Sequence, residues 1–306
     1  MLNRYTTIRV FWSALLTLIL SPAVIASPNC DRASAINHEA YQIHKSAPAA
    51  KLKKLLKRAL ALCPSHPEAH NNLADMLREE GRYVEAVAHY EQALRVRRYF
   101  PQAWNGLGEA YYKLKQFPLS LEAHLHVCKT NKESKARIKE LLADNRYAIT
   151  EENQILNKES LLLLYDKTRR VEINNMLANC GLRAKMRKVI VFRNLVFNSG
   201  KATLKRASRK QLNTIAAALN IIKPTRIKIG GHSDNQRWRG KSAAESKWLN
   251  LALSQRRANT VKNGLITHGI HQRRVQAKGY GESLPLVPGK SKTARAKNRR
   301  VEIDVR

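Results

Sequence analysis

The stretch "RIKIGGHSD" (226–234) begins as a strand and ends on a carboxylate. Its isoleucines alternate with basic residues, which is the period-2 pattern of a strand with one buried face. Two glycines interrupt the pattern, and His232, Ser233 and Asp234 follow them. A carboxylate at the end of a buried strand needs a partner, and the segments around this stretch indicate what that partner is.

Further strand and helix patterns surround this stretch. Strands are expected at 188–197, 226–232, 273–282 and 298–305, and amphipathic helices at 209–222 and 251–270. Their order, β-α-β-α-β-β, predicts an α+β fold in which helices pack on one side of a small sheet.

The positive charge of the chain is concentrated in this region. The 306 residues include 56 lysines and arginines against 23 aspartates and glutamates, a formal net charge of +33. Residues 183–306 hold 30 of the basic residues and only 5 of the acidic ones. Such a surface attracts polyanions, among them nucleic acid, anionic lipid head groups and polymers that carry carboxylates.

The first 26 residues have the pattern of a secretory signal peptide. Arg4 and Arg9 precede the apolar run "VFWSALLTLIL" (10–20), and small residues lead to a cleavage point after Ala26. An uncleaved anchor is the alternative, because the apolar stretch is close to the length that spans a bilayer. Export permits disulfide bonds among the four cysteines, and it argues against nucleic acid as the partner.

Two segments in the first half of the chain align at an offset of 34 residues. "PEAHNNLADMLREEGRYVEAVAHYEQAL" begins at Pro67 and "PQAWNGLGEAYYKLKQFPLSLEAHLHV" begins at Pro101. A 34-residue period of paired helices is typical of tetratricopeptide repeats, and the segments resemble that family, most closely at Trp104 and Leu107. With a weaker copy from about Ala33, we expect about three repeats and a capping helix. Such a solenoid presents a surface to a protein partner, and a simple spacer is the alternative.

The repeat register also bears on the cysteines. Cys30 lies at the start of the first helix of a hairpin and Cys63 at the end of the second. We therefore expect a Cys30–Cys63 disulfide, with two free buried thiols as the alternative. The sequence alone does not pair Cys128 with Cys180.

Five short motifs follow one another in the basic region. They are "FNSGKATL" (197–204), "GHSD" (231–234), "NLALSQRRANTV" (250–261), "GYGE" (279–282) and "NRRVEI" (298–303). On these motifs the region resembles the OmpA-like C-terminal domain, which peptidoglycan-associated lipoproteins and flagellar stator proteins share. The resemblance implies a β-α-β-α-β-β sandwich that binds peptidoglycan non-covalently.

The same resemblance implies a binding site. In the family an aspartate after the second strand and an arginine on the next helix hold the diaminopimelate of the stem peptide, and the matching residues are Asp234 and Arg257. Asn250, Leu253 and Ser254 are further matching positions. The chemistry agrees, because an amino-acid head group needs an anion for its ammonium and a forked cation for its carboxylate.

Three further expectations concern the surroundings of this site. Residues 235–249 are expected to form a long loop. Arg257 is expected to lie one turn into its helix, where backbone N–H groups add to a carboxylate pocket. His232 is expected to be structural, because no second histidine or cysteine stands at metal-ligand spacing.

These patterns predict a non-catalytic envelope protein that is exported to the periplasm and needs no cofactor or metal. Its expected partners are peptidoglycan and a protein bound by the repeats, with no nucleic acid, and a peripheral contact with the outer membrane stays open. The alternative is a basic envelope protein that binds anionic lipid or lipopolysaccharide phosphates by charge. The predicted domains are a signal peptide (1–26), tetratricopeptide repeats with a cap (27–146), a connector (147–186) and the OmpA-like domain (187–306).

Overall fold

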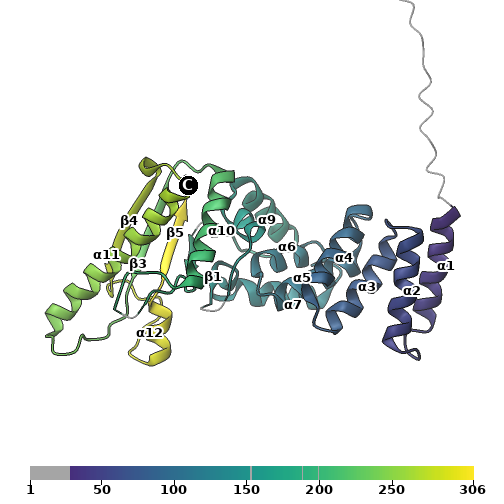
Figure 1. Cartoon of the computed structure of the whole chain (residues 1–306), viewed down its shortest axis with the longest axis horizontal. Helices are drawn as coiled ribbons and strands as arrows, with labels where there is room; N and C mark the ends of the chain where they lie inside the picture. Colours follow the sequence, from purple (N-terminus) through teal and green to yellow (C-terminus); the bar gives the residue numbers. More distant parts are fainter. Residues whose placement is uncertain (1–27, 152–153, 188, 199) are drawn as a thin grey trace, which may run out of the picture.

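The computed structural model describes residues 28–151, 154–187, 189–198 and 200–306 (Figure 1). The predicted signal peptide, 1–26, lies outside the described residues. Within the described ranges, no helix combines the length and the apolar character that crossing a bilayer requires.

Paired helices form the N-terminal half of the molecule. The hairpins are α1 (Pro28–Gln42) with α2 (Ala49–Leu62), α3 (Pro67–Glu79) with α4 (Tyr83–Val96), and α5 (Pro101–Lys113) with α6 (Phe117–Leu125). The helix α7 (Lys132–Leu142) follows as the expected cap. The hairpins stand in a row along the long axis (Figure 1), each packed on the next. Pro67 and Pro101 occupy the first turns of α3 and α5, where the fixed φ of proline favours a helix start.

Small residues allow neighbouring helices of the solenoid to approach closely. A Cβ atom on Gly106 would lie 2.3 Å from the Tyr90 ring, and one on Gly108 would lie 2.6 Å from the His124 ring. Tyr90 and His124 are both fully buried. The small residues of the 34-residue pattern therefore mark helix–helix contacts within the solenoid.

Five described strands form one sheet in the C-terminal half. They are β1 (Ile149–Thr150), β2 (Val189–Phe192), β3 (Ile227–His232), β4 (Val275–Gly281) and β5 (Val301–Val305), in the order β1-β2-β5-β3-β4. The strand β5 runs antiparallel to both β2 and β3, whereas β4 is parallel to β3.

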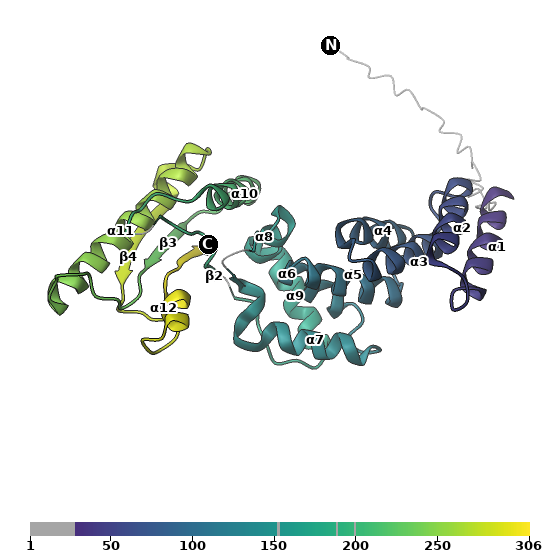
Figure 2. The same cartoon turned by 60° about the horizontal axis from the view of Figure 1, so that its bottom comes forward.

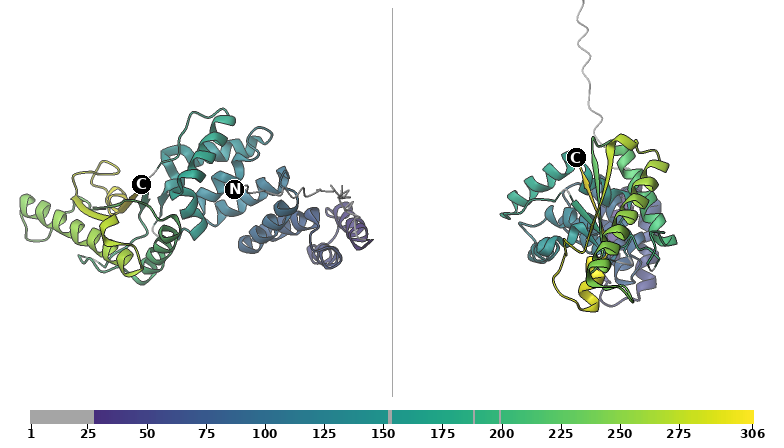
Figure 3. Two further views of the ribbon diagram at one scale, coloured as in Figure 1. Left: turned by 90° about the horizontal axis from the view of Figure 1, so that it is seen from above. Right: turned by 90° about the vertical axis from the view of Figure 1, so that its left-hand side faces the viewer.

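Two long helices, α10 (Arg206–Ile222) and α11 (Ala243–Thr267), accompany this sheet, and α11 packs on β3 and β4 (Figure 3, right). The predicted fold class is confirmed. The patterns did not predict the strand β1, the short helix α12 (Lys292–Asn298) or the 3-10 turn η2 (Gln272–Arg274).

Residues 147–186, which we expected to be a connector, pack into the core of the sheet domain. They include the end of η1 (Ala143–Ala148), the strand β1, and the helices α8 (Lys158–Tyr165) and α9 (Lys167–Asn179). The helix α8 lies between α6 and α10 (Figure 2) and contacts both. One hydrophobic core runs from Phe117 of the last repeat to Val305 of the sheet, through Leu161 and Leu164. The domain boundaries given above remain predictions.

A buried set of amide side chains also joins the last repeat to the sheet. Gln116 of the repeats donates a hydrogen bond to the carbonyl of Ile155 at 2.8 Å. Deeper in the core, Asn194 donates to Gln211 Oε1 at 2.9 Å and accepts from the hydroxyl of Thr150 at 2.8 Å. These buried polar groups find partners in one another, which makes the junction specific as well as apolar.

The helix α11 begins earlier than the sequence analysis expected. The prediction of a loop over 235–249 is wrong in its second half, because the helix starts at Ala243. The Ser242 hydroxyl accepts from the Glu245 N–H at 3.2 Å, and the Glu245 carboxylate accepts from the Ser242 N–H at 2.8 Å. This capping box fixes the helix start. Arg257 therefore lies about four turns into α11, and the N–H groups of the helix start are too distant to line its pocket.

Candidate functional site

The sheet topology brings the ends of three strands to one edge. Because β5 lies between β2 and β3 and runs antiparallel to both, Val301 pairs with Phe192 on one side and with Gly231 on the other. The residue after β2, the residues after β3 and the residues before β5 therefore meet at this edge. Arg193, Asp234 and Arg299 occupy those positions.

Asp234 has a cationic partner that the sequence analysis did not name. Its Oδ2 accepts from Nη1 of Arg299 at 2.5 Å, and its Oδ1 accepts from the backbone N–H of Gln236 at 2.9 Å. The Asp234 residue is 7% exposed, whereas the Arg299 side chain is 46% exposed. The backbone of Gln236 thus holds one carboxylate oxygen, and the more exposed Arg299 pairs with the other.

Arg257 reaches the same edge from α11. It is buried, its guanidinium lies 5.0 Å from the centre of the Phe197 ring, and its Nε donates to the Lys201 carbonyl at 3.2 Å. Burial and then repulsion by Arg299 lower the pKa of Arg257, and the attraction of Asp234 opposes this. Among the described residues its two Nη atoms have no hydrogen-bond partner, so they are available to a carboxylate.

The structure thus brings Asp234 and Arg257 to one place without a hydrogen bond between them in the described part of the chain. A cavity of about 70 Å³ lies beside Asp234 and is lined by Arg257, Phe197, Arg193 and Arg299 among others, but not by Asp234 itself. The signal for Arg299 was present in the motif "NRRVEI". The antiparallel pairing that makes it a neighbour of Asp234 is long-range, and no local pattern reveals it.

Asn250 holds the chain that follows β3. Its Nδ2 donates to the carbonyls of Asp234 at 3.3 Å and Gln236 at 3.2 Å, and to the Glu282 carboxylate at 3.0 Å. Its Oδ1 accepts from the indole N–H of Trp238 at 2.8 Å. With these contacts Asn250 is a positioning residue for Asp234.

Leu253 and Ser254 fix α11 against the sheet. Leu253 is 5% exposed, and the Ser254 hydroxyl accepts from the Gly281 N–H at 2.8 Å. A Cβ atom on Gly231 would lie 2.3 Å from the Ser254 carbonyl oxygen, and one on Gly279 would lie 2.6 Å from the Ser254 hydroxyl. The glycines in these strands therefore allow close contact with the helix that carries Arg257.

His232 is buried on β3 and stacks on Tyr280, with ring centres 5.1 Å apart. Burial, followed by the charge of Arg300, lowers the pKa of His232 to about 4, although the Glu302 carboxylate 3.7 Å away opposes the shift. Across the described ranges, no cluster of three or more histidine, cysteine or acidic side chains could hold a metal ion.

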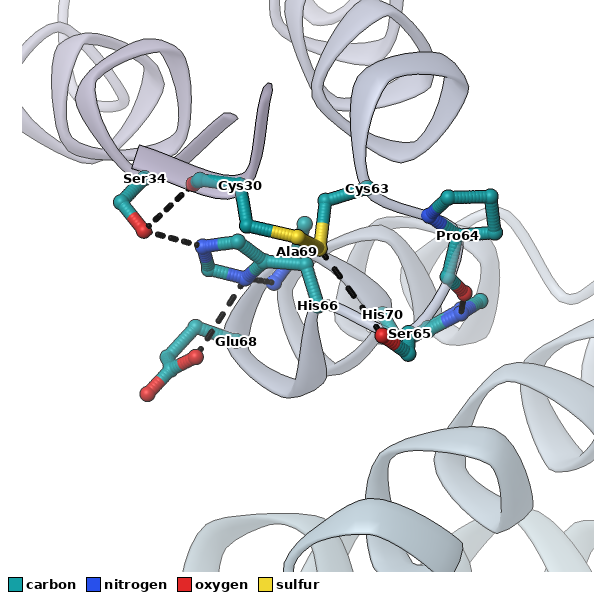
Figure 4. The surroundings of a disulfide bond; sticks show 9 residues. All are labelled: Cys30, Ser34, Cys63, Pro64, Ser65, His66, Glu68, Ala69 and His70. Carbon is teal, nitrogen blue, oxygen red and sulfur yellow. Dashed lines mark hydrogen bonds and ion pairs between the residues drawn. A yellow bond between two sulfur atoms is a disulfide. The ribbon is translucent and has the colours of Figure 1, made fainter. Parts of the chain in front are cut away.

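A disulfide joins Cys30 at the start of α1 to Cys63 at the end of α2, with their Cα atoms 4.9 Å apart (Figure 4). The Ser34 hydroxyl donates to the Cys30 carbonyl at 3.0 Å and lies 2.9 Å from Nε2 of His66. The His66 Nδ1 accepts from the Ala69 N–H at 3.2 Å, which caps α3. The disulfide therefore clamps the first hairpin at the end where it meets the second.

A second disulfide joins Cys128, just after α6, to Cys180, at the end of α9. Their Cα atoms lie 5.9 Å apart, and both residues belong to the core shared by the last repeat and the sheet. This bond ties the repeats to the segment that leads into the sheet.

The repeats also form a groove of about 840 Å³ along α3, α5 and α7. Arg137 lies in it and bridges the carboxylates of Glu109 at 2.9 Å and Glu140 at 2.6 Å. The groove is polar and large enough for an extended segment of a partner, and its lining names no particular ligand.

Comparison with protein families finds matches in both halves of the chain. Residues 196–299 match the model described as the OmpA family. Residues 55–88 and 74–115 match two models of the tetratricopeptide repeat. The chain contains an OmpA-family domain preceded by tetratricopeptide repeats. Both resemblances inferred from the sequence motifs are confirmed.

Several curated proteins are similar to this chain over about 110 residues. "Probable lipoprotein YiaD" of Escherichia coli is 34% identical over 36% of this chain and 47% of its own length. "Outer membrane protein A" of Bordetella avium is 32% identical over 39% of this chain and 57% of its own length. "Peptidoglycan-binding protein ArfA" of Mycobacterium bovis is 32% identical over 36% of this chain and 32% of its own length. The chain thus spans 32% to 57% of the length of these relatives.

Solved structures with similarity to the chain include the cell wall anchor of the T6SS from Pseudomonas aeruginosa. It is 31% identical, with a TM-score of 0.33, over 38% of this chain and 79% of that one. The peptidoglycan-associated lipoprotein from Burkholderia pseudomallei is 25% identical, with a TM-score of 0.31, over 39% of this chain and 91% of that one.

Proposed function

We propose that this protein is a non-catalytic envelope protein that attaches to peptidoglycan by recognising the diaminopimelate of its stem peptides. The observation that carries the proposal is the placement of Arg257 and Arg299 around one cavity at an edge of the sheet, with Asp234 beside it as the ion-pair partner of Arg299. The similarity to a relative named as a peptidoglycan-binding protein supports it. Neither matched family is a catalytic one.

The end of diaminopimelate that projects from the stem peptide carries an ammonium and a carboxylate on one carbon. Asp234 accepts hydrogen bonds from the ammonium, and the two unpaired Nη atoms of Arg257 donate to the carboxylate as a fork. In the free protein Asp234 forms an ion pair with Arg299, which the ligand ammonium would replace. Because this ion pair is partly exposed, it is weak and exchanges readily for the ligand ammonium.

The repeats give this anchor a second surface. We propose that the groove along α3, α5 and α7 binds a protein partner, which the OmpA-family domain then holds at the peptidoglycan layer. The shared core and the Cys128–Cys180 disulfide connect the two surfaces. The proposed location is the periplasm, after removal of the signal peptide, with the outer membrane within reach.

Anionic lipid is the second candidate ligand, and one surface feature favours it. Trp248 is 67% exposed and Leu251 is 47% exposed, one turn apart on the N-terminal half of α11. Lys247 precedes Trp248 on the same helix and is exposed, as is Lys241 just before the helix. Apolar side chains flanked by lysines are typical of surfaces that lie in a membrane interface. Binding of this kind depends steeply on salt concentration.

Titration with soluble peptides tests the first candidate. The ligands are a tripeptide with diaminopimelate in third position and its lysine counterpart, which lacks the distal carboxylate. We expect at least tenfold weaker binding of the lysine peptide, and of the diaminopimelate peptide to Asp234→Asn and Arg257→Gln. Arg256→Gln is the matched control, since Arg256 is the exposed neighbour of Arg257. If both site variants bind like the control, diaminopimelate recognition at this edge is refuted.

A further inference from the structure

The cavity at the candidate site has more positive charge than a diaminopimelate head group can balance. Arg193, Arg257 and Arg299 line it, and the carboxylate beside them is Asp234, which pairs with Arg299 and attracts Arg257. A zwitterionic head group adds one positive and one negative charge. The bound site would therefore keep two uncompensated positive charges in a partly buried space, which is unfavourable.

Arg300 also lines the cavity, but its guanidinium is already paired. It donates to the Glu302 carboxylate at 2.7 Å and to the Leu284 carbonyl at 3.1 Å. The excess charge therefore belongs to the other three arginines, and Arg193 is the one that the proposed head-group binding does not use.

Arg193 is held in place by the segment that joins the repeats to the sheet. It directly follows β2, and its backbone N–H donates to the hydroxyl of Thr150 in β1 at 3.0 Å. Its Nε is buried and has no hydrogen-bond partner among the described residues. A buried N–H of a charged group without an acceptor costs free energy, and a ligand oxygen would remove that cost.

The strand order gives the distance between the backbones of Arg193 and Asp234. Arg193 follows β2 and Asp234 follows β3, with β5 between these strands. Two strand spacings separate their backbones, roughly 10 Å. The cavity of about 70 Å³, which Arg193 and Arg257 both line, has room for a carboxylate group. A second carboxylate of the same peptide, several bonds away from the head group, can reach Arg193 across this separation.

We propose that Arg193 binds a second carboxylate of the stem peptide, so that the site selects peptides in which that group is free over peptides in which it is amidated. This inference rests on the proposed function. Two carboxylates qualify, namely the α-carboxylate of the γ-linked glutamate before diaminopimelate and the C-terminal carboxylate of the peptide. Both present the planar pair of oxygens that a guanidinium binds as a fork.

Calorimetric titration of the full mature protein distinguishes these two sources. The probes are three forms of an alanyl-glutamyl-diaminopimelate peptide: the free acid, the glutamate α-amide and the C-terminal amide. We expect the protein to bind the free acid at least tenfold more tightly than one of the two amides. The amide that binds weakly identifies the carboxylate that Arg193 holds.

In Arg193→Gln the free acid and that amide are expected to bind equally, while both still bind. Arg193→Lys keeps the charge without the fork and is expected to keep only part of the preference. Arg183→Gln, which removes an exposed positive charge elsewhere, is expected to leave the preference unchanged. A full preference in Arg193→Gln, or equal binding of all three peptides by the parent, overturns the inference alone. No binding of any peptide by the parent overturns the proposed function and the inference together.

Discussion

Removal of the Cys30–Cys63 disulfide is expected to loosen the first helix while the rest of the chain stays folded. The helix α1 is terminal in the described chain and packs mainly on α2, burying the small residues Ala33 and Ala40. Few apolar contacts hold it, so local opening at this end is favoured. The covalent bond to Cys63 therefore contributes a large share of its stability.

The length of the chain between the two cysteines sets how much the disulfide stabilises the hairpin. The two cysteines are 33 residues apart, and the chain-entropy relation for a loop of this length gives about 4 kcal/mol. In the double variant Cys30→Ser/Cys63→Ala, amide protons of α1 are expected to exchange several-hundred-fold faster, at roughly tenfold for each 1.4 kcal/mol.

Hydrogen exchange followed by mass spectrometry measures this for each helix separately. The matched control is Cys128→Ser/Cys180→Ala, which removes the other disulfide and is expected to leave α1 unchanged. Unaltered exchange of α1 in the first variant, or equal acceleration in α5 and α1, would refute the clamp that we derive from the hairpin geometry.

Three further variants test other parts of the account. Gly279→Ala places a Cβ atom 2.3 Å from the backbone nitrogen of Gln255. We therefore expect the free energy of unfolding in urea to fall by about 1–3 kcal/mol. Ser242→Ala removes the N-cap of α11, and amides in its first two turns are expected to exchange about fivefold faster, for a cap worth about 1 kcal/mol. The pKa of buried His124 is lowered to about 4 by burial, so its stabilising effect is present above pH 6.5 and is lost as the pH falls toward 4. The free energy of unfolding is therefore expected to fall between pH 7 and pH 4.5 by about 2–3 kcal/mol less in His124→Gln than in the parent, as measured by urea unfolding.

The repeats and the sheet domain were predictable because their signals are local. The 34-residue period places Pro67 and Pro101 at equivalent helix starts, and the alternation in 226–232 follows the buried face of β3. The position of α11 was also readable, since "SAAE" (242–245) is a capping-box sequence. The apolar pattern alone does not show this start, because it becomes regular only from Leu251 onward.

The remaining features depend on contacts between residues far apart in the chain. Arg299 lies 65 residues from Asp234 and becomes its partner only through the pairing of β3 with β5. The strand β1 has just two residues, too few for a periodic pattern, yet it fixes Arg193 through Thr150. A single sequence gives the residue types of such a site, and the register of the sheet decides which of them meet.

Co-sedimentation with purified sacculi tests the central claim most directly. The parent, Asp234→Ala, Arg257→Ala and the control Arg256→Ala are pelleted with sacculi at low and at high salt. The account predicts that the parent and the control pellet at both salt concentrations, while both site variants stay in the supernatant at high salt. Pelleting of the site variants like the parent, abolished in all four proteins by salt alone, would show that the basic surface binds the wall and would contradict the recognition of diaminopimelate.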